Sequence, residues 1–237
     1  MLAVFVNMAA VIIGSLLGIF FRKKIKPEYF NTVVSALALI TMSLGIASAI
    51  KTENMLVIVI CLVIGTIIGT LLKINSRIEG AGDYIKQKLF KSESKESRFT
   101  EGFVTASIMF CVGSMAIMGS LDAGISHEYG TIFTKSALDF VMAIAFGAAM
   151  GVGVTFSALF VLVYQGALTL LSGLIAPYLS ASVVLEMSSV GGILLIGTGL
   201  NMLALSDKKI IVADMMPAIF LPLLYFPIAN LISGVLS

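Results

Sequence analysis

Charged residues are scarce in this sequence. Of its 237 residues, 12% are Asp, Glu, Lys or Arg and 59% are hydrophobic, whereas an average globular protein has roughly 25% charged residues. A water-soluble domain of this length would need far more charge at its surface. With a mean hydropathy of +1.08, the composition instead indicates a chain whose solvent is lipid.

Residues that usually build metal, redox and catalytic centres are also rare. There is one histidine, His127, and no metal-ligand cluster can be assembled around it from sequence spacing. The two cysteines, Cys61 and Cys111, lie inside apolar runs and are expected to be small buried hydrophobes. The sequence has no nucleophile-elbow, nucleotide-binding or H-E-x-x-H pattern. The net charge of +2 is too small and too dispersed for nucleic-acid binding, so we expect no enzyme, cofactor or nucleic-acid partner.

What the sequence has in abundance is long apolar runs. A bilayer core of about 30 Å needs about 20 mostly apolar residues per helix. By this measure the sequence predicts an all-α, polytopic transmembrane bundle of eight spans within a single domain, residues 1–237. The spans are Leu2–Phe21, Asn31–Ile50, Met55–Leu72, Gly102–Ser120, Thr131–Met150, Val154–Pro177, Leu185–Leu205 and Ile210–Leu236. The break between the fifth and sixth spans is placed in the glycine-rich stretch Gly147–Gly153.

The distribution of Lys and Arg predicts the orientation of the spans. Basic side chains close to a span are held on the cytoplasmic side during insertion. With both termini outside, thirteen of the fifteen basic residues are cytoplasmic, only Lys51 faces out, and only Lys135 lies within a span. We therefore expect a multi-pass protein of the plasma membrane with an N-out, C-out topology. The first segment lacks a basic stretch before its apolar run, so it is expected to be a retained span and not a signal peptide.

One hydrophilic segment, Lys73–Thr100, connects the third and fourth spans. Ile78, Ala81, Ile85 and Leu89 recur in it at helical spacing, with charged residues between them. This pattern predicts a cytoplasmic amphipathic helix, lying in the interface and followed by a solvated linker. A partner-docking role for the segment is the alternative to simple anchoring.

Two internal likenesses suggest repeated units. Gly113–Asp139 resembles Gly191–Asp214, across a pair of spans that would run in opposite directions through the membrane. Inverted repeats of this kind are typical of transporters. Ile13–Gly18 resembles Ile64–Gly69, and both carry G-x-x-x-G, which allows close helix packing. Packing within one chain is the simpler explanation, and a seam between copies in a homo-oligomer is the alternative.

Polar residues inside spans identify the candidate pathway. An ionised carboxylate in mid-span costs at least about 2.5–3.5 kcal/mol. Asp139 lies well inside the fifth span, and Lys135 is four residues earlier on the same helix face, where the two charges can neutralise each other. Asp214 could instead cap its helix, and Glu186 is expected at the outer interface. A substrate or ion site and a self-satisfied ion pair both remain open for Asp139 and Lys135.

Neutral groups extend this candidate pathway. Gln165 lies in the sixth span, and Ser136 is adjacent to Lys135. Glycines make the seventh span a poor helix, so that it could be broken and expose backbone groups to a cavity; tight packing is the alternative. The pathway residues of the seventh span are Gly191, Gly192, Gly197, Gly199 and Asn201.

These motifs together resemble a known family. The sequence is similar to the uncharacterised bacterial membrane proteins grouped as domain of unknown function 554. The likeness rests on Asn7–Gly18, Phe110–Ser120, Lys135–Asp139, Gly151–Ser157, Ser189–Gly192, Gly197–Leu200 and Met216–Ala218. Where the family carries asparagine before the Met-x-Pro-Ala run, this chain has Asp214, which weakens any role that needs a fixed charge there. The resemblance implies an integral membrane protein, related to transport and without an assigned substrate.

The expected function is the movement of a small solute or ion across the bilayer, with Asp139 and Lys135 as the polar centre. The alternative is a membrane scaffold or sensor that does not transport and that docks a partner through the 73–100 segment. A transporter would place a solvent-reachable cavity at Asp139, lined by glycines of the seventh span.

The topology can be tested with single-cysteine variants labelled from outside intact cells. We expect a membrane-impermeant thiol reagent to reach the Asp122–Gly130 loop and Ser237 and to miss Lys73–Thr100. Labelling of Lys88→Cys from outside would overturn the orientation.

Overall fold

The computed structural model describes residues 1–22, 28–89, 99–112, 114–204 and 208–226. Within these ranges every regular element is a helix. The elements are α1 Leu2–Arg22, α2 Glu28–Ala49, α3 Met55–Leu71, α4 Ile74–Leu89, α5 Phe99–Cys111, α6 Ser114–Ile125, α7 Gly130–Met150, α8 Val152–Ile175, η1 Ala176–Tyr178, α9 Ala181–Leu203 and η2 Val212–Phe220. The predicted all-α bundle is therefore confirmed.

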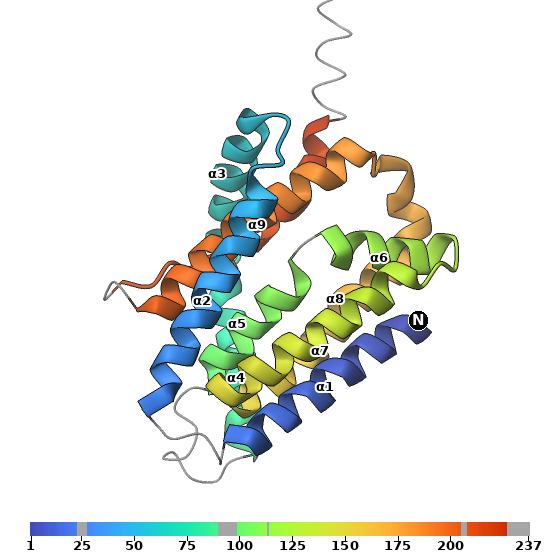
Figure 1. The fold of residues 1–237 in the computed structure, drawn as a ribbon. Coiled ribbons are helices and arrows are strands. Elements are labelled where there is room, and N and C mark those ends of the chain that lie inside the picture. Colours follow the sequence, from blue (N-terminus) through green and yellow to red (C-terminus); the bar gives the residue numbers. More distant parts are fainter. Residues whose placement is uncertain (23–27, 90–98, 113, 205–207, 227–237) are drawn as a thin grey trace, which may run out of the picture.

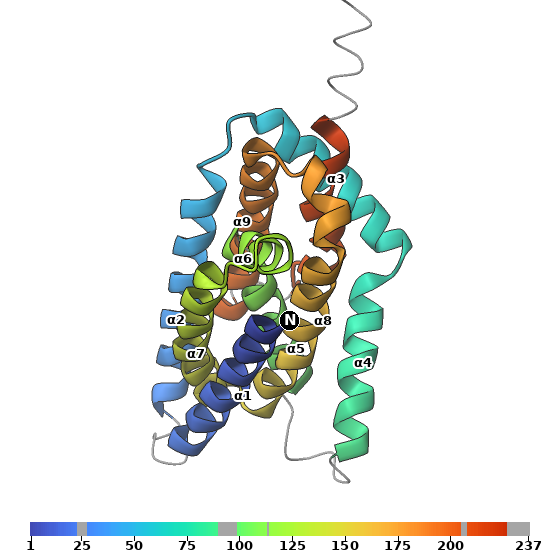
Figure 2. The ribbon, with the colours of Figure 1, turned by 90° about the vertical axis from the view of Figure 1, so that its right-hand side faces the viewer.

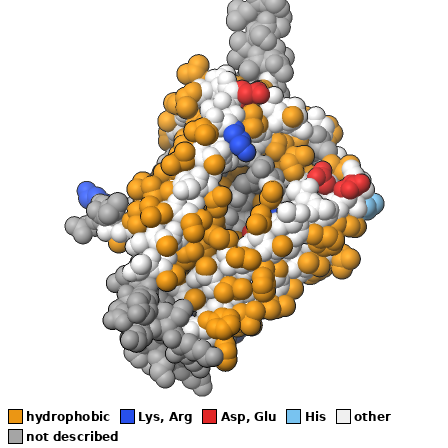
Figure 3. All heavy atoms as spheres, viewed as in Figure 1, with side chains coloured by type: hydrophobic (Ala, Val, Ile, Leu, Met, Phe, Trp, Pro, Cys, Tyr) orange, Lys and Arg blue, Asp and Glu red, His pale blue; other side chains and the backbone are white. Residues whose placement is uncertain are grey.

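Five of the helices are long and apolar enough to cross a membrane: α1, α2, α7, α8 and α9. Two bent pairs, α3 with α4 and α5 with α6, raise this number to seven if each pair is one span. The expected eighth span, Ile210–Leu236, extends beyond the described residues. Its described part contains a shorter apolar helical segment, Val212–Phe226. Large apolar side chains cover much of the surface in Figure 3, as lipid contact requires.

The sequence locates one helix break correctly and misses another. Gly151 separates α7 from α8 with φ of 82°, a left-handed conformation that glycine adopts without steric cost, inside the predicted stretch Gly147–Gly153. The span predicted at Gly102–Ser120 is a bent pair of helices, because α5 and α6 meet at 61°. The possible break in the seventh span is absent, since α9 is continuous over Ala181–Leu203.

The helices pack in two neighbouring groups. In Figure 1, α1 lies along α7, and α2 lies along α9; Figure 2 shows the same two pairs from the side. α8 lies against α1, α5 and α6, while α3 packs on η2. The amphipathic helix expected after the third span is α4, which packs on α5 and η2, and the linker expected after it lies at residues outside the described set.

Glycines let these pairs approach at backbone distance. In α1, a Cβ on Gly18 would overlap the carbonyl oxygen of Ile144, and one on Gly14 would meet Phe140. In α3, Cβ atoms on Gly65 and Gly69 would overlap the backbone of η2. Both G-x-x-x-G motifs therefore serve packing within the chain.

Two buried carboxylates hold helix starts at the bends of the chain. Glu186 of α9 is 1% exposed and accepts hydrogen bonds from the backbone N–H of Glu53 (2.9 Å) and Asn54 (3.2 Å), just before α3. The carboxylate of Asp214 accepts one from the backbone N–H of Asn75 in the first turn of α4, at 2.7 Å. An acceptor at this position satisfies a donor that the helix itself cannot pair. Glu186 is thus buried and holds the turn before α3, while its expected position at the outer interface stays a prediction.

Glycine packing predicts a sharp contrast between two substitutions. Gly18→Ala should lower the free energy of unfolding by about 1–3 kcal/mol, because the new methyl group overlaps α7. Gly173→Ala is the matched control in α8, where an added Cβ meets nothing within 4 Å. Thermal denaturation of a fluorescent-protein fusion, followed by size-exclusion chromatography in detergent, measures both. Equal melting temperatures for the two variants would contradict the packing argument.

The cap on α4 predicts that Asp214 needs an acceptor oxygen and no charge. Asp214→Asn should keep wild-type thermal stability, because an amide oxygen can still accept from Asn75. Asp214→Ala should lose about 1 kcal/mol, the usual value of a helix cap. The same melting assay separates these outcomes, and an unstable Asp214→Asn protein would show that the charge itself matters.

Candidate functional site

The candidate site lies where α1, α7 and α8 meet. Lys135 and Asp139 of α7 form an ion pair one turn apart. Asn7 of α1 donates a hydrogen bond from Nδ2 to Asp139 Oδ2 at 3.0 Å. The same amide group donates to Gln165 Oε1 of α8, also at 3.0 Å. We call these four residues the polar centre; it contains three of the predicted pathway residues and adds Asn7.

The polar centre is almost entirely closed to solvent. Asn7 and Gln165 are 0% exposed, Lys135 is 5% and Asp139 is 8% exposed. Asp139 is nine residues into the 21-residue α7, so it lies near the middle of a helix about 31 Å long. An ion pair at this depth has exchanged water for protein partners, and removing one partner typically costs 3–5 kcal/mol.

Several polar atoms beside the ion pair have no hydrogen-bond partner among the described residues. They include Asn7 Oδ1 and Gln165 Nε2, an acceptor and a donor on the two amides that already touch each other. The hydroxyl of Tyr164, the neighbour of Gln165 in α8, is a third. Each such group costs about 1–3 kcal/mol when buried, and more where no water is near. The centre therefore holds unused hydrogen-bonding capacity.

The bend between α5 and α6 adjoins this centre. Cys111, the last residue of α5, is 1% exposed and belongs to one buried cluster with Ala143 and Phe146 of α7. Tyr164 packs against the same cluster. The end of α5, the ion pair and the amide of α8 thus form one buried neighbourhood.

Other predicted pathway residues have local structural partners. The hydroxyl of Ser136 donates to the carbonyl of Ile132 within α7, at 2.7 Å. Asn201 donates to the carbonyl oxygen of Ile210 (2.7 Å) and accepts from its N–H (2.8 Å), which fastens the end of α9 to the chain entering η2. Asp214 caps α4, as described above, and does not contact the polar centre through any hydrogen bond of the described residues.

The predicted glycines of α9 pack against neighbouring segments. A Cβ on Gly192 would meet Gly45 of α2, and one on Gly199 would overlap Met42. Gly197 faces Val212 at the start of η2. Gly191 is buried within the same helix. These contacts agree with tight helix packing, the alternative that the sequence analysis gave to a broken seventh span.

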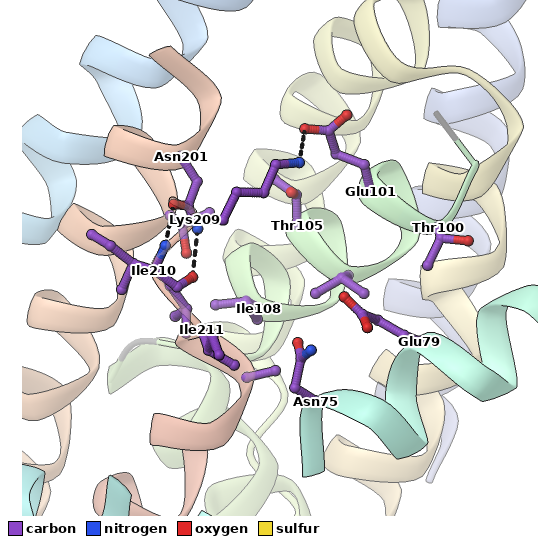
Figure 4. Close-up of a pocket in the computed structure, with 14 residues that line it drawn as sticks. Asn75, Glu79, Thr100, Glu101, Thr105, Ile108, Asn201, Lys209, Ile210 and Ile211 are labelled. Atoms are coloured by element: carbon purple, nitrogen blue, oxygen red, sulfur yellow. Dashed lines mark hydrogen bonds and ion pairs between the residues drawn. The ribbon is translucent and has the colours of Figure 1, made fainter. Parts of the chain in front are cut away.

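Two polar cavities lie at one end of the molecule and share Glu101, Asn201 and Lys209 in their linings. Their volumes are about 300 and 440 Å³. The Lys209 ammonium is 3.1 Å from a carboxylate oxygen of Glu101 (Figure 4). Neither of these two cavities is the one expected at Asp139, because neither lining includes Asp139 or a glycine of α9.

Sequence reasoning missed Asn7 and Glu101, although each carried a signal. Asn7 lies on the same face of α1 as Gly14 and Gly18, at helical spacings of seven and four, and that face packs on α7. Glu101 is an acidic residue in the first turn of a helix that was assigned to the fourth span. For Asn7, a polar residue on the glycine-bearing face of a helix is the signal that it is buried against the neighbouring helix.

Comparison with known proteins shows that this chain is similar to uncharacterised proteins. The chain is 28% identical over 220 residues to "Uncharacterized membrane protein YdfK" of Bacillus subtilis (strain 168), covering 91% of each chain. It is 27% identical over 220 residues to "Uncharacterized protein YqgA" of Escherichia coli (strain K12), covering 92% of each chain. No solved structure matches it. The profile described as "Protein of unknown function (DUF554)" matches residues 2–226, and the chain therefore belongs to this family of membrane proteins.

Proposed function

We propose that the protein moves a small ion or polar solute across the membrane through the polar centre. The observation that carries the proposal is a pair of buried groups without partners, Asn7 Oδ1 and Gln165 Nε2, on the two amides that are hydrogen-bonded to each other beside the Lys135–Asp139 ion pair. A cargo with its own donors and acceptors can satisfy these groups as it passes. Charged and amide side chains facing the interior of a bundle are the usual markers of such pathways.

A scaffold or sensor has less support from the same geometry. The buried polar groups of a scaffold serve stability alone, so each of them should have a hydrogen-bond partner on a neighbouring helix. In the part of the chain that the structure describes, Asn7 Oδ1 and Gln165 Nε2 next to the ion pair have no hydrogen-bond partner. The partner-docking alternative rests on the 73–100 segment, of which α4 packs on α5 and η2.

Two further features belong to this proposal. The first is an N-out, C-out protein of the cytoplasmic membrane, supported by the distribution of Lys and Arg. The second is the inverted repeat. Contacts from Gly14 and Gly18 advance along α7, so α1 and α7 run parallel, whereas those from Gly65 and Gly69 run backwards along η2. Because the first and third spans are expected to cross in the same direction, α7 and η2 would then run in opposite directions, as inverted copies require.

The proposal predicts that Asp139→Asn lowers the flux per folded molecule, over and above the loss of folded protein that an unpaired Lys135 would cause. The amide keeps an acceptor for Asn7 but removes the charge that answers Lys135. Flux of protons, sodium, potassium and small neutral solutes into proteoliposomes, measured with entrapped dyes and by osmotic swelling, provides the readout. Wild-type protein that moves none of these would favour the scaffold.

The double variant Lys135→Met with Asp139→Leu separates function from stability. Replacing a buried ion pair by apolar residues of similar size is often neutral or stabilising, so this protein should fold. The hydrogen bond between Asn7 and Gln165 can also persist in it. We expect a folded and inactive protein. Full activity of the double variant would exclude the ion pair from the pathway.

A further inference from the structure

The charge on Asp139 determines how two amide side chains are turned. An ionised carboxylate can only accept hydrogen bonds, so Asn7 has to present its Nδ2 group to Asp139 Oδ2, at 3.0 Å. The same Nδ2 group donates to Gln165 Oε1, also at 3.0 Å. Asn7 Oδ1 and Gln165 Nε2 are the atoms that this arrangement leaves without partners. The orientation of both amides therefore follows from the ionised state of Asp139.

A protonated Asp139 requires the opposite orientation. Its hydroxyl group donates, so Asn7 has to turn over and accept with Oδ1, and Gln165 has to turn over and donate from Nε2 to that oxygen. The terminal torsions of Asn and Gln are broad and roughly two-fold, so both amides can turn over within their pockets. Each arrangement contains two hydrogen bonds. The unused atoms change from Asn7 Oδ1 and Gln165 Nε2 to Asn7 Nδ2 and Gln165 Oε1.

Charge balance connects this change to Lys135. A proton bound beside the ammonium would leave a net positive charge in the buried centre, which is costly, whereas departure of the ammonium keeps the centre neutral. Lys135 is the sixth residue of α7, about 7.5 Å along the axis from the first residue at 1.5 Å per residue. A lysine stem can stay in apolar surroundings while its ammonium reaches water. Lys135 can therefore leave Asp139 toward the start of α7.

Solvent exposure places the entry of a proton at the ion pair. The side chains of Lys135 and Asp139 are 7% and 11% exposed, whereas Asn7 and Gln165 are 0% exposed. A proton from water thus meets the carboxylate first and affects the amides only through it.

The other titratable groups on the helices that pack against α7 lie apart from this contact. Cys111 and Tyr164 are in or against the buried cluster that contains Ala143, one turn beyond Asp139. The rest lie in or before the first turn of a helix or in its last turn: the amino terminus of Met1, Arg22, Glu28, Tyr29, Glu101 and Asp122. Among the described residues, Lys135 is thus the charged group that contacts Asp139.

We infer that the polar centre is a proton switch, in which Asp139 exchanges the Lys135 ammonium for a proton from the water at the start of α7, and Asn7 and Gln165 turn over in response. The proton adds to a carboxylate oxygen, Lys135 keeps its own protons, and release of the proton restores the ion pair. The inference rests on the proposed function and names the proton as its coupled ion. Because the unused donor and acceptor change places, a polar cargo held by the two amides binds differently in the two states.

The glutamines give a direct readout of the switch. The chain has two of them, Gln165 in the centre and the exposed Gln87 of α4, which is the internal control for general effects of pH. In lipid bilayers, with glutamine labelled by ¹⁵N in its side chain, an Nε2 proton of Gln165 should shift downfield on acidification, because it gains a hydrogen bond. The same pH step should produce the infrared band of a protonated carboxyl group, which Asp139→Asn should lack. A Gln165 signal that is independent of pH, or that responds equally in Asp139→Asn, would overturn the inference.

Two variants test the parts of the switch separately. Lys135→Met should hold the Gln165 signal at its acidic position at every pH, because a buried carboxyl group without a counter-charge stays protonated. Asn7→Leu, an apolar replacement of similar size, should keep the carboxyl band but abolish the response of Gln165, because Asn7 connects the two groups. A normal pH response of Gln165 in either variant contradicts the mechanism. The wild-type titration decides the inference if a variant does not fold.

Flux measurements distinguish failure of this inference from failure of the proposed function. If flux depends on Asp139 while the wild-type Gln165 signal is independent of pH, the centre transports without a proton switch, and the inference is wrong. If Gln165 responds as expected but wild-type protein moves no ion or solute, the switch stands as a pH-responsive element and the proposed transport fails.

Discussion

The interior of a bilayer offers no hydrogen-bond partners, and this constraint determines where the polar residues of the protein lie. Each of the three carboxylates that are buried among the described residues has a partner: Asp139 pairs with Lys135, Glu186 binds the turn before α3, and Asp214 binds the start of α4. Two of these acids thus stabilise bends of the backbone, where helix donors would otherwise be unpaired. Asp139 is bound by Asn7, whose Oδ1 has unused hydrogen-bonding capacity, as does Nε2 of the adjoining Gln165.

Glycine packing positions this polar centre. Because Gly14 and Gly18 bring α1 to backbone distance from α7, the short side chain of Asn7 on the same face can reach Asp139. A larger residue at Gly18 would separate the helices and lengthen the Asn7–Asp139 hydrogen bond. Stability and the geometry of the centre therefore depend on the same contact.

Hydropathy and charge predicted most helices, the Gly151 break and the Lys135–Asp139 pair, because each depends on neighbours in sequence. The bend between α5 and α6 was not predictable in this way, since an apolar run of the right length resembles a straight span. Asn7 and the partners of Asp214 and Asn201 depend on which helices pack together, which one sequence does not specify. For the α9 glycines, tight packing and a broken helix predict the same residues in the sequence. The contacts of these glycines with α2 and η2 distinguish the two explanations.

Asp214 contacts both helices of the bend between α3 and α4. Its carbonyl oxygen is at the point where Gly69 brings α3 against η2, and its carboxylate holds the first turn of α4. The α3–α4 junction between these contacts bends by 53° and contains Lys73 with φ of 52°. A displacement of η2 would consequently move α3 and α4 at the same time. The two helices should therefore shift together and not independently.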